Sequence, residues 1–180
     1  MDKNGRLTST TDDNNNVSQN LYDAVNRKTE EIYQDNSSKR YSFNQYGMVE
    51  QITDNNGTII NHSYDYAVRL IQKDISQTTG VKGVTKEEFE YDGLARMTRA
   101  ANYENATLIS QVKKQYDSLS NLIKETQQIG EQSVKSVVSE YDASNFRVKL
   151  TYPGGKIIYF TPDGLNRITQ IKPDYLTPIA

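Results

Sequence analysis

Residues 91–97 read Tyr-Asp-Gly-Leu-Ala-Arg-Met, and this pattern decides the fold of the chain. It pairs an aromatic with an acidic residue, places Arg four residues after the acid and closes on an aliphatic residue. The acidic position recurs along the 180 residues as seven Asp and one Asn, with successive gaps of 21, 21, 21, 27, 25, 25 and 21 residues. These positions are Asp2, Asp23, Asn44, Asp65, Asp92, Asp117, Asp142 and Asp163. Repeats of this length indicate one small unit stacked many times, so function is expected in the assembled surface.

Each copy of the pattern has the chemistry of a tight turn. Its Asp can accept a hydrogen bond from the backbone two residues on, and a Gly or Asn near its end tolerates positive φ. Runs of β-branched and aliphatic residues follow, such as 48–52, and then a second set of turn formers, of which Asn56-Gly57 is a strong hairpin signal. One repeat is therefore predicted to be strand, hairpin turn, strand and Asp turn.

Successive repeats of this kind predict an all-β fold, an antiparallel β-meander ribbon of tandem hairpins. The Asp turns would line one edge of the sheet and the Gly/Asn turns the other. A helical alternative for residues 85–97 and 108–123 lacks a sustained 3.6-residue apolar period, and both segments contain the turn motif. We expect the repeat array to fill residues 1–171, with residues 172–180 as a C-terminal extension, a truncated unit.

The lengths of the units support hairpins. The three long units exceed 21 residues by 6, 4 and 4, and every increment is even. Equal additions to both arms of a hairpin keep each side chain on its face, whereas an odd addition would need a bulge. In the unit that starts at Asp142, Arg147 and Val148 come one place later than Arg and the aliphatic residue elsewhere. We therefore expect a local slip there, with a bulge near residues 145–146.

The composition argues against several classes of function. Hydrophobic residues make up 35% of the chain and charged residues 24%, which favours a sheet with one buried face and one wet face over a thick core. A formal net charge of -2 without a basic stripe argues against nucleic acid or an anionic membrane surface as partner. Cys is absent, which excludes disulfides and thiolate chemistry. No apolar run approaches the roughly 20 residues that span a bilayer.

The repeat motif holds the residues to which we assign a role, and that role is structural. An Arg bonded to its own Asp or to a neighbouring one would fix the turn and the strand ladder at once, and such exposed pairs contribute about 0–1 kcal/mol. Two alternatives use the same side chains: a ladder of Arg could bind an anionic glycan, and the 13 Tyr could stack on sugar faces. The motif residues are Tyr22, Asp23, Tyr64, Asp65, Arg69, Tyr91, Asp92, Arg96, Tyr116, Asp117, Tyr141, Asp142, Asp163 and Arg167.

Residues with catalytic chemistry do not converge in this sequence. His62 is the only histidine and has Ser63 and Asp65 nearby, but adjacent residues of a strand point to opposite faces and cannot form a triad. The oxygen-rich segments 12–16 and 54–57 offer ligands that calcium accepts, yet they lack a twelve-residue loop that ends in Glu. We therefore predict solvated turns, with no catalytic residues, no cofactor and no metal site.

The pattern resembles the rearrangement-hotspot (Rhs), or YD-repeat, family, whose units read Tyr-Asp, two variable residues and Gly-Arg-Leu. The resemblance spans about residues 2–171. It rests on the five Tyr-Asp pairs, on Gly5 and Gly47, on Arg6, Arg27, Arg69, Arg96 and Arg167, and on Leu7, Val49, Leu70, Met97, Leu122 and Ile168.

The resemblance implies a β-ribbon that spirals into a hollow shell, as in bacterial insecticidal toxin complexes, polymorphic contact-dependent toxins and teneurins. It implies a non-enzymatic shell-wall segment of a large secreted or cell-surface bacterial protein, which encloses or presents a C-terminal toxin domain. The closing segment of the family, with its Asp-Pro and Gly-rich pattern, has no copy here, and no cargo domain follows Ile171. The chain thus looks like an excerpt of a larger protein, and its partners would be the rest of the parent shell and its toxin cargo.

A second hypothesis is a carbohydrate-binding cell-surface module that uses the Tyr and Arg columns. Salt-dependent heparin binding that is lost on Tyr substitution would favour this module, whereas an adjoining toxin domain would favour the wall. The unpaired edges of an open meander also favour edge-to-edge self-association.

Overall fold

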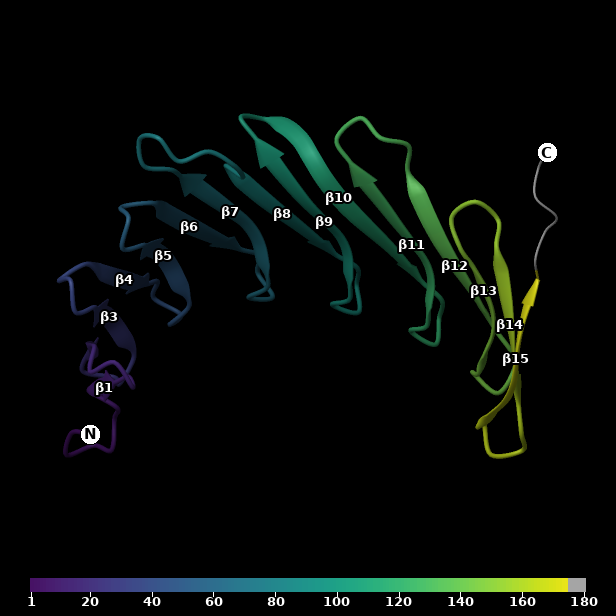
Figure 1. Ribbon diagram of the computed structural model, residues 1–180, viewed down its shortest axis with the longest axis horizontal. Helices are drawn as coiled ribbons and strands as arrows, with labels where there is room; N and C mark the ends of the chain where they lie inside the picture. Colours follow the sequence, from purple (N-terminus) through teal and green to yellow (C-terminus); the bar gives the residue numbers. More distant parts are fainter. Residues whose placement is uncertain (175–180) are drawn as a thin grey trace. The chain divides into compact units, whose positions relative to one another are not determined.

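The computed structural model of the protein describes residues 1–174, and residues 175–180 lie outside the described part. The described chain forms fifteen strands and no helix, and the strands follow one another in chain order in one open antiparallel sheet (Figure 1). The predicted all-β meander is confirmed, and the helical alternative is wrong. The strands are β1 (Ser9–Thr11), β2 (Val17–Tyr22), β3 (Lys28–Ile32), β4 (Ser38–Phe43), β5 (Val49–Thr53), β6 (Ile59–Tyr64), β7 (Leu70–Ser76), β8 (Lys86–Tyr91), β9 (Met97–Glu104), β10 (Thr107–Tyr116), β11 (Leu122–Ile129), β12 (Lys135–Tyr141), β13 (Arg147–Thr151), β14 (Ile157–Pro162) and β15 (Ile168–Asp174).

The chain divides into two compact units. The first holds Met1–Glu88 with Tyr103–Ala106, and the second holds Phe89–Asn102 with the chain from Thr107 onward. Each unit is a run of hairpins. The predicted C-terminal extension starts at residue 172, within the last three residues of β15, and its remaining residues, 175–180, lie outside the described part.

Twelve turns of the described chain share one five-residue geometry, and the turns after β7, β9 and β11 differ from it. At Asp65, the backbone N–H donates to the Arg69 carbonyl at 3.0 Å, and the Val68 N–H donates to the Asp65 carbonyl at 3.0 Å. The fourth residue has a left-handed backbone, with φ of 63° at Val68. A turn closed by a left-handed residue suits a three-residue hairpin loop. The same two backbone bonds recur in the turns that open at Asp2, Asp12, Asp23, Tyr33, Asn44, Asp54, Asp92, Asp117, Asp142, Tyr152 and Asp163.

A bulge accompanies the Asp turns. Tyr64 pairs with Leu70, but the preceding Ser63 pairs with Gln72, so Ile71 is the extra residue. A bulge bends the strand and increases its twist, and here it does so at the same place in successive hairpins. The same register shift recurs at Tyr22, Phe43, Tyr116, Tyr141 and Pro162.

The hairpin that follows Tyr141 differs from our expectation. Its register shifts at Tyr141, and the extra residue is Val148. The backbone carbonyl of Phe146 accepts the Asp142 N–H at 2.9 Å and so closes the turn. Phe146 thus occupies the turn position that Arg occupies in other repeats. The predicted bulge near residues 145–146 is therefore wrong. This hairpin has its bulge at the same place as the others, and it differs from them only in which residue types fill the turn positions.

The two faces of the sheet differ in chemistry, as strand alternation requires. In the first unit, one cross-strand row is aromatic and aliphatic, and it consists of Tyr41, Ile52, Ile60 and Ile75. The row beside it on the other face is polar, and it consists of Ser42, Gln51, Asn61 and Asp74. In the second unit the apolar row Leu150, Ile158 and Pro173 lies on the face opposite the polar row Lys149, Tyr159 and Lys172.

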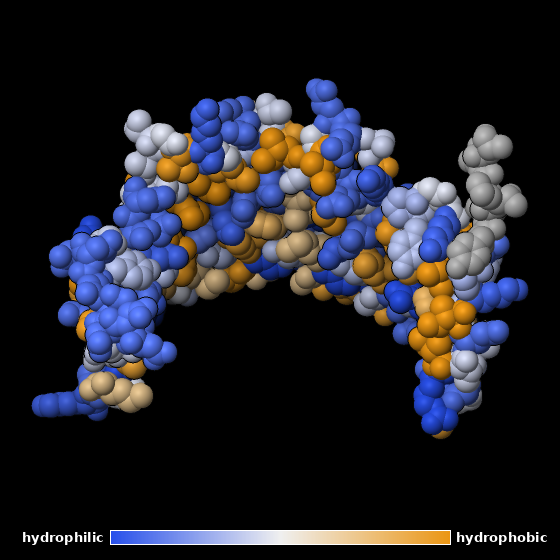
Figure 2. Space-filling view, in the orientation of Figure 1, coloured by the Kyte–Doolittle hydropathy of each residue, from blue (hydrophilic) through white to orange (hydrophobic). Residues whose placement is uncertain are grey.

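The sheet has no thick core. Among the described residues the only buried hydrophobic side chains are Ala101 and Leu150, and Thr58 is the only buried polar residue. Figure 2 shows hydrophobic side chains at the surface over the last two strands, where Ile168 and Ile171 are 54% and 59% exposed. The apolar face is thus half-buried within a single layer. Strand pairing and turn contacts must therefore supply much of the order that a two-layer protein takes from its core.

Candidate functional site

The carboxylate of each Asp turn holds the turn together. At Asp65, Oδ1 accepts the backbone N–H groups of Ala67 and Arg69, both at 2.9 Å, and Oδ2 accepts Nε–H of Arg69 at 2.7 Å. One carboxylate thus satisfies two backbone donors and one guanidinium through charge-assisted bonds. The same three bonds occur at Asp2, Asp23, Asp92 and Asp163.

The Arg of a turn also reaches the next repeat. In the second unit, Nη1 of Arg96 donates to the Asp117 carbonyl and to Oγ of Ser120, both at 3.0 Å. In the first unit, Nη1 of Arg6 donates to Oδ1 of Asn26 at 3.0 Å. One guanidinium therefore bonds its own turn and the following one, which fixes the lateral position of two hairpins.

The same guanidinium lies over the aromatic ring that opens the next repeat. Arg96 lies 4.7 Å from the centroid of the Tyr116 ring, and Arg6 lies 5.0 Å from that of Tyr22. A cation over a ring face at this distance is an attractive cation–π contact. We call this set the turn clasp: an Asp, the Arg four residues on, and the aromatic residue of the next repeat. Arg27 makes the same contact with Phe43 at 4.4 Å.

The Tyr hydroxyl adds a further bond between repeats. Tyr64 donates to the Val49 carbonyl at 2.7 Å, and Tyr116 donates to the Met97 carbonyl at 3.1 Å. The acceptor belongs in each case to the residue just after the Arg position of the preceding repeat. Tyr22 and Tyr141 make equivalent bonds to the carbonyls of Leu7 and Leu122.

Several turns replace the Arg and keep part of the clasp. Asn121 stands in the Arg position after Asp117 and donates to Asp117 Oδ2 at 2.8 Å and to Oδ1 of Asn145 in the next turn. Asn44 stands in the Asp position, and its amide oxygen accepts the N–H groups of Tyr46 and Met48 at 2.9 and 3.0 Å. A neutral oxygen is thus enough to bind the two backbone donors.

The predicted motif residues all lie beside the Asp turns of their units. The five Tyr end strands β2, β6, β8, β10 and β12, and each Asp opens the turn that follows. The structure brings Arg69, Arg96 and Arg167 onto their own Asp residues. It does not form an unbroken Arg column. The turns of Asp117 and Asp142 hold Asn121 and Phe146 in that position, and the side chain of Arg167 is 73% exposed.

The clasp shifts the titration of its carboxyl groups. At Asp23, Asp65 and Asp163 the pKa lies below the usual 3.8, first because the backbone N–H of the Arg four residues on donates to the carboxylate, with the Arg side chain adding to this effect. At Asp117 the pKa is lowered first by the side chain of Asn121. Hydrogen bonds to the ionised form favour that form, so these carboxylates are charged at neutral pH.

His62 and Ser63 lie on opposite faces, as predicted, because His62 pairs with Lys73 and Ser63 with Gln72 on the same neighbouring strand. Burial lowers the pKa of His62, and the Lys73 ammonium adds to this effect. Nδ1 of His62 is buried and has no hydrogen-bond partner among the described residues. His62 and Ser63 therefore cannot act together in a catalytic triad. Within residues 1–174 no group of three or more His, Cys, Asp or Glu side chains is placed to hold a metal ion.

The Arg was expected on its own Asp or on a neighbouring one, and the structure places Arg96 on both Asp92 and the Asp117 carbonyl. The sequence did not predict the contact of this Arg with the aromatic ring of the next repeat, or the carbonyl partner of the Tyr hydroxyl. A signal for this was available, because the Arg is followed by the aromatic residue of the next repeat, 16 residues on for Arg6 and Arg27 and 20 residues on for Arg96. A pairing that recurs from unit to unit indicates a repeated contact.

The fold and the clasped turns define a repeat protein built as a meander of β-hairpins. Solved structures of Tc toxin assemblies have this fold. A Tc holotoxin pore of Photorhabdus luminescens, with a mutation in TccC3, matches 98% of this chain with a TM-score of 0.74 and 18% identity. A crystal structure of TcdB2-TccC3-TEV matches 98% with a TM-score of 0.75 and 19% identity, and one of TcdB2-TccC3-Cdc42 matches 93% with a TM-score of 0.75 and 20% identity.

This chain spans 10% of the length of each of those chains. No protein-family model matches the sequence, and no curated protein matches it. At the level of fold, the predicted resemblance to the repeat shell of Tc-type toxins is confirmed. Among residues 1–174 there is no helix long and apolar enough to cross a membrane.

Proposed function

We propose that the chain is a strip of the wall of a closed repeat shell, within a large secreted or cell-surface bacterial protein that encloses or presents a toxin domain. The observation that carries this proposal is the match itself. Nearly the whole chain, 98%, superposes on one tenth of a Tc toxin assembly chain with a TM-score of 0.75. A segment that repeats end to end and fits inside a far longer repeat array is best explained as part of such an array.

The mechanism of such a wall is mechanical. Its strands need no second layer, because each repeat is held to the next by backbone pairing and by the turn clasp. Arg96 illustrates the principle: it bonds Asp92 in its own turn and the Asp117 carbonyl in the next. A continuous wall of this kind would keep water and proteases away from a cargo until delivery. The motif residues act in this proposal as fasteners between repeats.

The proposal assigns no chemistry to the chain itself. The partners of the wall are the remainder of the parent shell and its toxin cargo, and the unpaired edges of the isolated segment favour self-association. The alternative of a glycan bound by the Arg and Tyr columns gains no support from the geometry. Arg96 is already bonded to two turns and covers the ring of Tyr116, whose hydroxyl is bonded to a carbonyl.

The test is to image the longest polypeptide that carries this chain by electron cryomicroscopy, with limited proteolysis of the same sample. We expect residues 9–174 as adjacent strands in the wall of a closed shell, and protection of any domain held inside. Arg96→Glu should open the wall to protease, whereas Lys82→Glu, a charge reversal on an exposed loop residue, should leave protection unchanged. The proposal would be contradicted if these residues formed a free-standing sheet on the outside of another domain. It would also be contradicted if the protease digested the enclosed domain equally fast within the full polypeptide and as a separate domain.

A further inference from the structure

A pocket in the first unit lies at a turn clasp that has neither its Asp nor its Arg. In this repeat Asn44 opens the turn, and Met48 stands in the Arg position. The pocket has a volume of about 700 Å³, which is within the range of ligand sites, and Asn44, Met48 and Tyr64 are all part of its lining. Because these residues hold the three clasp positions of the repeat, the pocket is at the place of the clasp itself.

The other copies of the clasp show which group covers the aromatic ring in this position. Such a ring belongs to the residue directly before the turn, and Tyr64 comes directly before Asp65 in the same way. The ring position thus binds guanidinium elsewhere in the chain, through an Arg of the preceding repeat. The copies and the distances to the ring centroids are Arg6 over Tyr22 at 5.0 Å, Arg27 over Phe43 at 4.4 Å and Arg96 over Tyr116 at 4.7 Å.

The Arg residues of the flanking repeats are engaged in their own clasps. Arg27 donates to Oδ2 of Asp23 at 2.7 Å, and Arg69 donates to Oδ2 of Asp65 at 2.7 Å. A guanidinium for the Tyr64 ring would therefore come from another polypeptide.

The charge of the pocket is complementary to a cation. Asn44 is neutral, but Glu50 and Asp65 both line the pocket, and no Lys or Arg is among the described residues of the lining. Asp65 is paired with Arg69 at 2.7 Å, so Glu50 determines the net charge at this place. A cation would thus find a carboxylate here, as the guanidinium of each complete clasp does.

The basic side chains beside the pocket do not oppose a cation. Burial lowers the pKa of His62, so its imidazole is neutral at pH 7. Lys73 pairs with His62 across the strands, and its ammonium is bonded to Glu87 at 2.8 Å. The local charge therefore stays negative.

The rest of the lining favours guanidinium over ammonium. It is aromatic and aliphatic, with Tyr46 and Tyr66 beside Tyr64, and with Val68 and Ile71. A guanidinium is planar and weakly hydrated, so it can lie flat on a ring while its edge bonds a carboxylate. An ammonium is a compact and strongly hydrated charge, and it gains less from such a lining.

We propose that this pocket binds an arginine side chain of a partner polypeptide, with Tyr64 as the ring under the guanidinium and Glu50 as its counter-charge. The partner would complete from outside a clasp that other repeats complete from within. The inference goes beyond the wall function and does not depend on it, because it rests on the clasp geometry alone. A single side chain in an open pocket should bind weakly, with a Kd on the order of millimolar for a short peptide.

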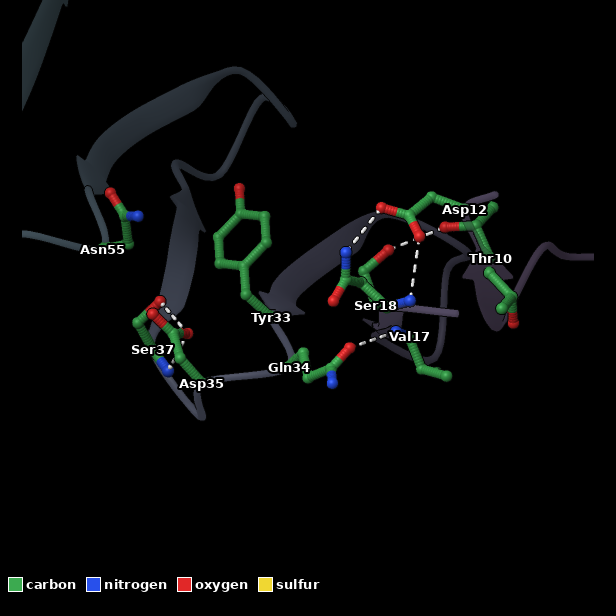
Figure 3. A pocket seen from close by; sticks show the side chains of 11 residues that line it. Thr10, Asp12, Val17, Ser18, Tyr33, Gln34, Asp35, Ser37 and Asn55 are labelled. Atoms are coloured by element: carbon green, nitrogen blue, oxygen red, sulfur yellow. Dashed lines mark hydrogen bonds between the residues drawn. The ribbon is translucent and has the colours of Figure 1, made fainter. Parts of the chain in front are cut away.

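A second groove of the first unit, of about 710 Å³ at the opposite edge, provides an internal control (Figure 3). It also combines a ring, Tyr33, with two carboxylates. Those carboxylates accept bonds within their own turns, Asp12 from Nδ2 of Asn16 at 2.8 Å and Asp35 from Oγ of Ser37 at 2.7 Å (Figure 3). Tyr33 also opens its turn, whereas a clasp ring precedes one. An arginine peptide should therefore prefer the Tyr64 pocket.

The test is a titration of the isotope-labelled chain by nuclear magnetic resonance. The probes are an acetylated and amidated Gly-Arg-Gly peptide and two analogues, with lysine or with citrulline in place of arginine. Citrulline has nearly the shape of arginine without its charge. The arginine peptide should shift the amide signals of Glu50 and Tyr64 and leave that of Gln34, in the second groove, in place. The lysine peptide should bind about threefold more weakly and the citrulline peptide about tenfold.

The chain offers a variant that covers the ring from within. Asn44→Asp combined with Met48→Arg gives this repeat the Asp and the Arg of the other clasps. The variant should bind the arginine peptide about tenfold more weakly or less, because its own guanidinium lies over Tyr64, and its melting temperature should rise. Asn121→Arg is the matched control, since it adds the same group to the turn that opens at Asp117, and it should leave the Kd within about twofold of that of the unsubstituted chain.

Glu50→Gln, on an exposed strand residue, provides a second variant should the double variant fail to fold, and it should weaken binding about threefold or more. The proposal is overturned if the arginine peptide at about 20 mM shifts neither the Glu50 nor the Tyr64 amide, or shifts Gln34 equally. It is also overturned if the citrulline peptide binds as tightly, or if the folded double variant or Glu50→Gln binds as the unsubstituted chain does. None of these results bears on the wall function, whose test uses Arg96 and the longest polypeptide that carries this chain.

Discussion

The two edges of the first unit make the same turn from different side chains. In the turn at Asp23, the Asp23 N–H donates to the Arg27 carbonyl at 2.9 Å, and Asn26 takes the left-handed position with φ of 68°. In the turn at Tyr33 on the opposite edge, the Tyr33 N–H donates to the Ser37 carbonyl at 2.9 Å, with φ of 63° at Asn36. Neither Asp nor Arg is needed to form this turn. What the Asp–Arg pair adds is the contact with the next repeat.

The two edges therefore differ in how they join neighbouring repeats. The clasped edge uses charges and rings, as when Arg6 bonds Oδ1 of Asn26 and covers the Tyr22 ring. The opposite edge joins neighbouring turns through neutral bonds, such as that from the Val17 N–H to Oε1 of Gln34 at 3.1 Å. The charged contacts between repeats are thus concentrated at the clasped edge.

Acid should produce the largest effect, and it bears on the clasped edge. The pKa values of Asp23, Asp65 and Asp163 are lowered in the folded chain, so their contribution to stability is fully present above the ordinary 3.8 and is lost as pH falls through the lower folded values. Thermal denaturation followed by circular dichroism should give a melting temperature that declines steeply below about pH 3.8.

The control for the acid effect is Asp65→Asn. The natural Asn44 binds its two backbone donors through a neutral oxygen, so this variant keeps the turn and removes the titrating charge. On acidification its melting temperature should therefore fall less than that of the unsubstituted chain. An unchanged melting temperature of the unsubstituted chain down to pH 3 would show that the clasped carboxylates do not contribute to stability.

Arg96→Ala should have the next largest effect. The substitution removes bonds to Asp92, the Asp117 carbonyl and Ser120 together with the contact over the Tyr116 ring. We expect the melting temperature to fall by about 5 °C. Arg167→Ala is the control, because its side chain is 73% exposed, and it should lower the melting temperature by about 1 °C or less. Equal effects of the two substitutions would remove the distinction between a turn fastener and a surface ion pair.

Val68→Gly should raise stability. Val68 has φ of 63°, a left-handed conformation that a β-branched residue adopts at a cost, whereas Gly47 fills the same position in the preceding Asp-turn repeat. Because the Val68 side chain is 47% exposed, little burial is lost. The melting temperature should rise by about 2 °C, and Val49→Gly within β5 should lower it. A fall for Val68→Gly would indicate that its side chain contributes more than its backbone costs.

His62 should give the smallest effect, at a higher pH than the carboxylates. Its pKa is lowered in the folded chain, so stability is fully present above the ordinary 6.5 and declines as pH falls from there through the folded value. A small decrease in melting temperature between pH 7 and 5 is expected in the unsubstituted chain and should be absent in His62→Gln. A decrease of the same size in both chains would show that other titrating groups cause the pH dependence.

The sequence predicted the regular part of this structure. The spacing of the eight acidic positions located the Asp turns, and the even insertions indicated hairpins that keep their faces. Both inferences depend only on local backbone geometry, which residues close in sequence determine. The bulge at Val148 was missed because Arg147 was read as a displaced copy of the motif, when the structure places Phe146 in the Arg position.

The contacts between repeats were harder to predict. Arg96 and Ser120 are 24 residues apart, and their meeting depends on the register of strands that the motif alone does not specify.

The central claim is that neighbouring repeats are fastened through the clasp, and a double-mutant cycle between Arg96 and Tyr116 tests it most directly. Chemical denaturation would give the free energy of unfolding of the parent, of Arg96→Ala, of Tyr116→Leu and of the double variant. We predict that the double variant loses about 1 kcal/mol less than the two single losses combined, because both single variants remove the same contact. Losses that are additive within error would contradict the claim, since they would mean that the guanidinium and the ring stabilise their hairpins separately.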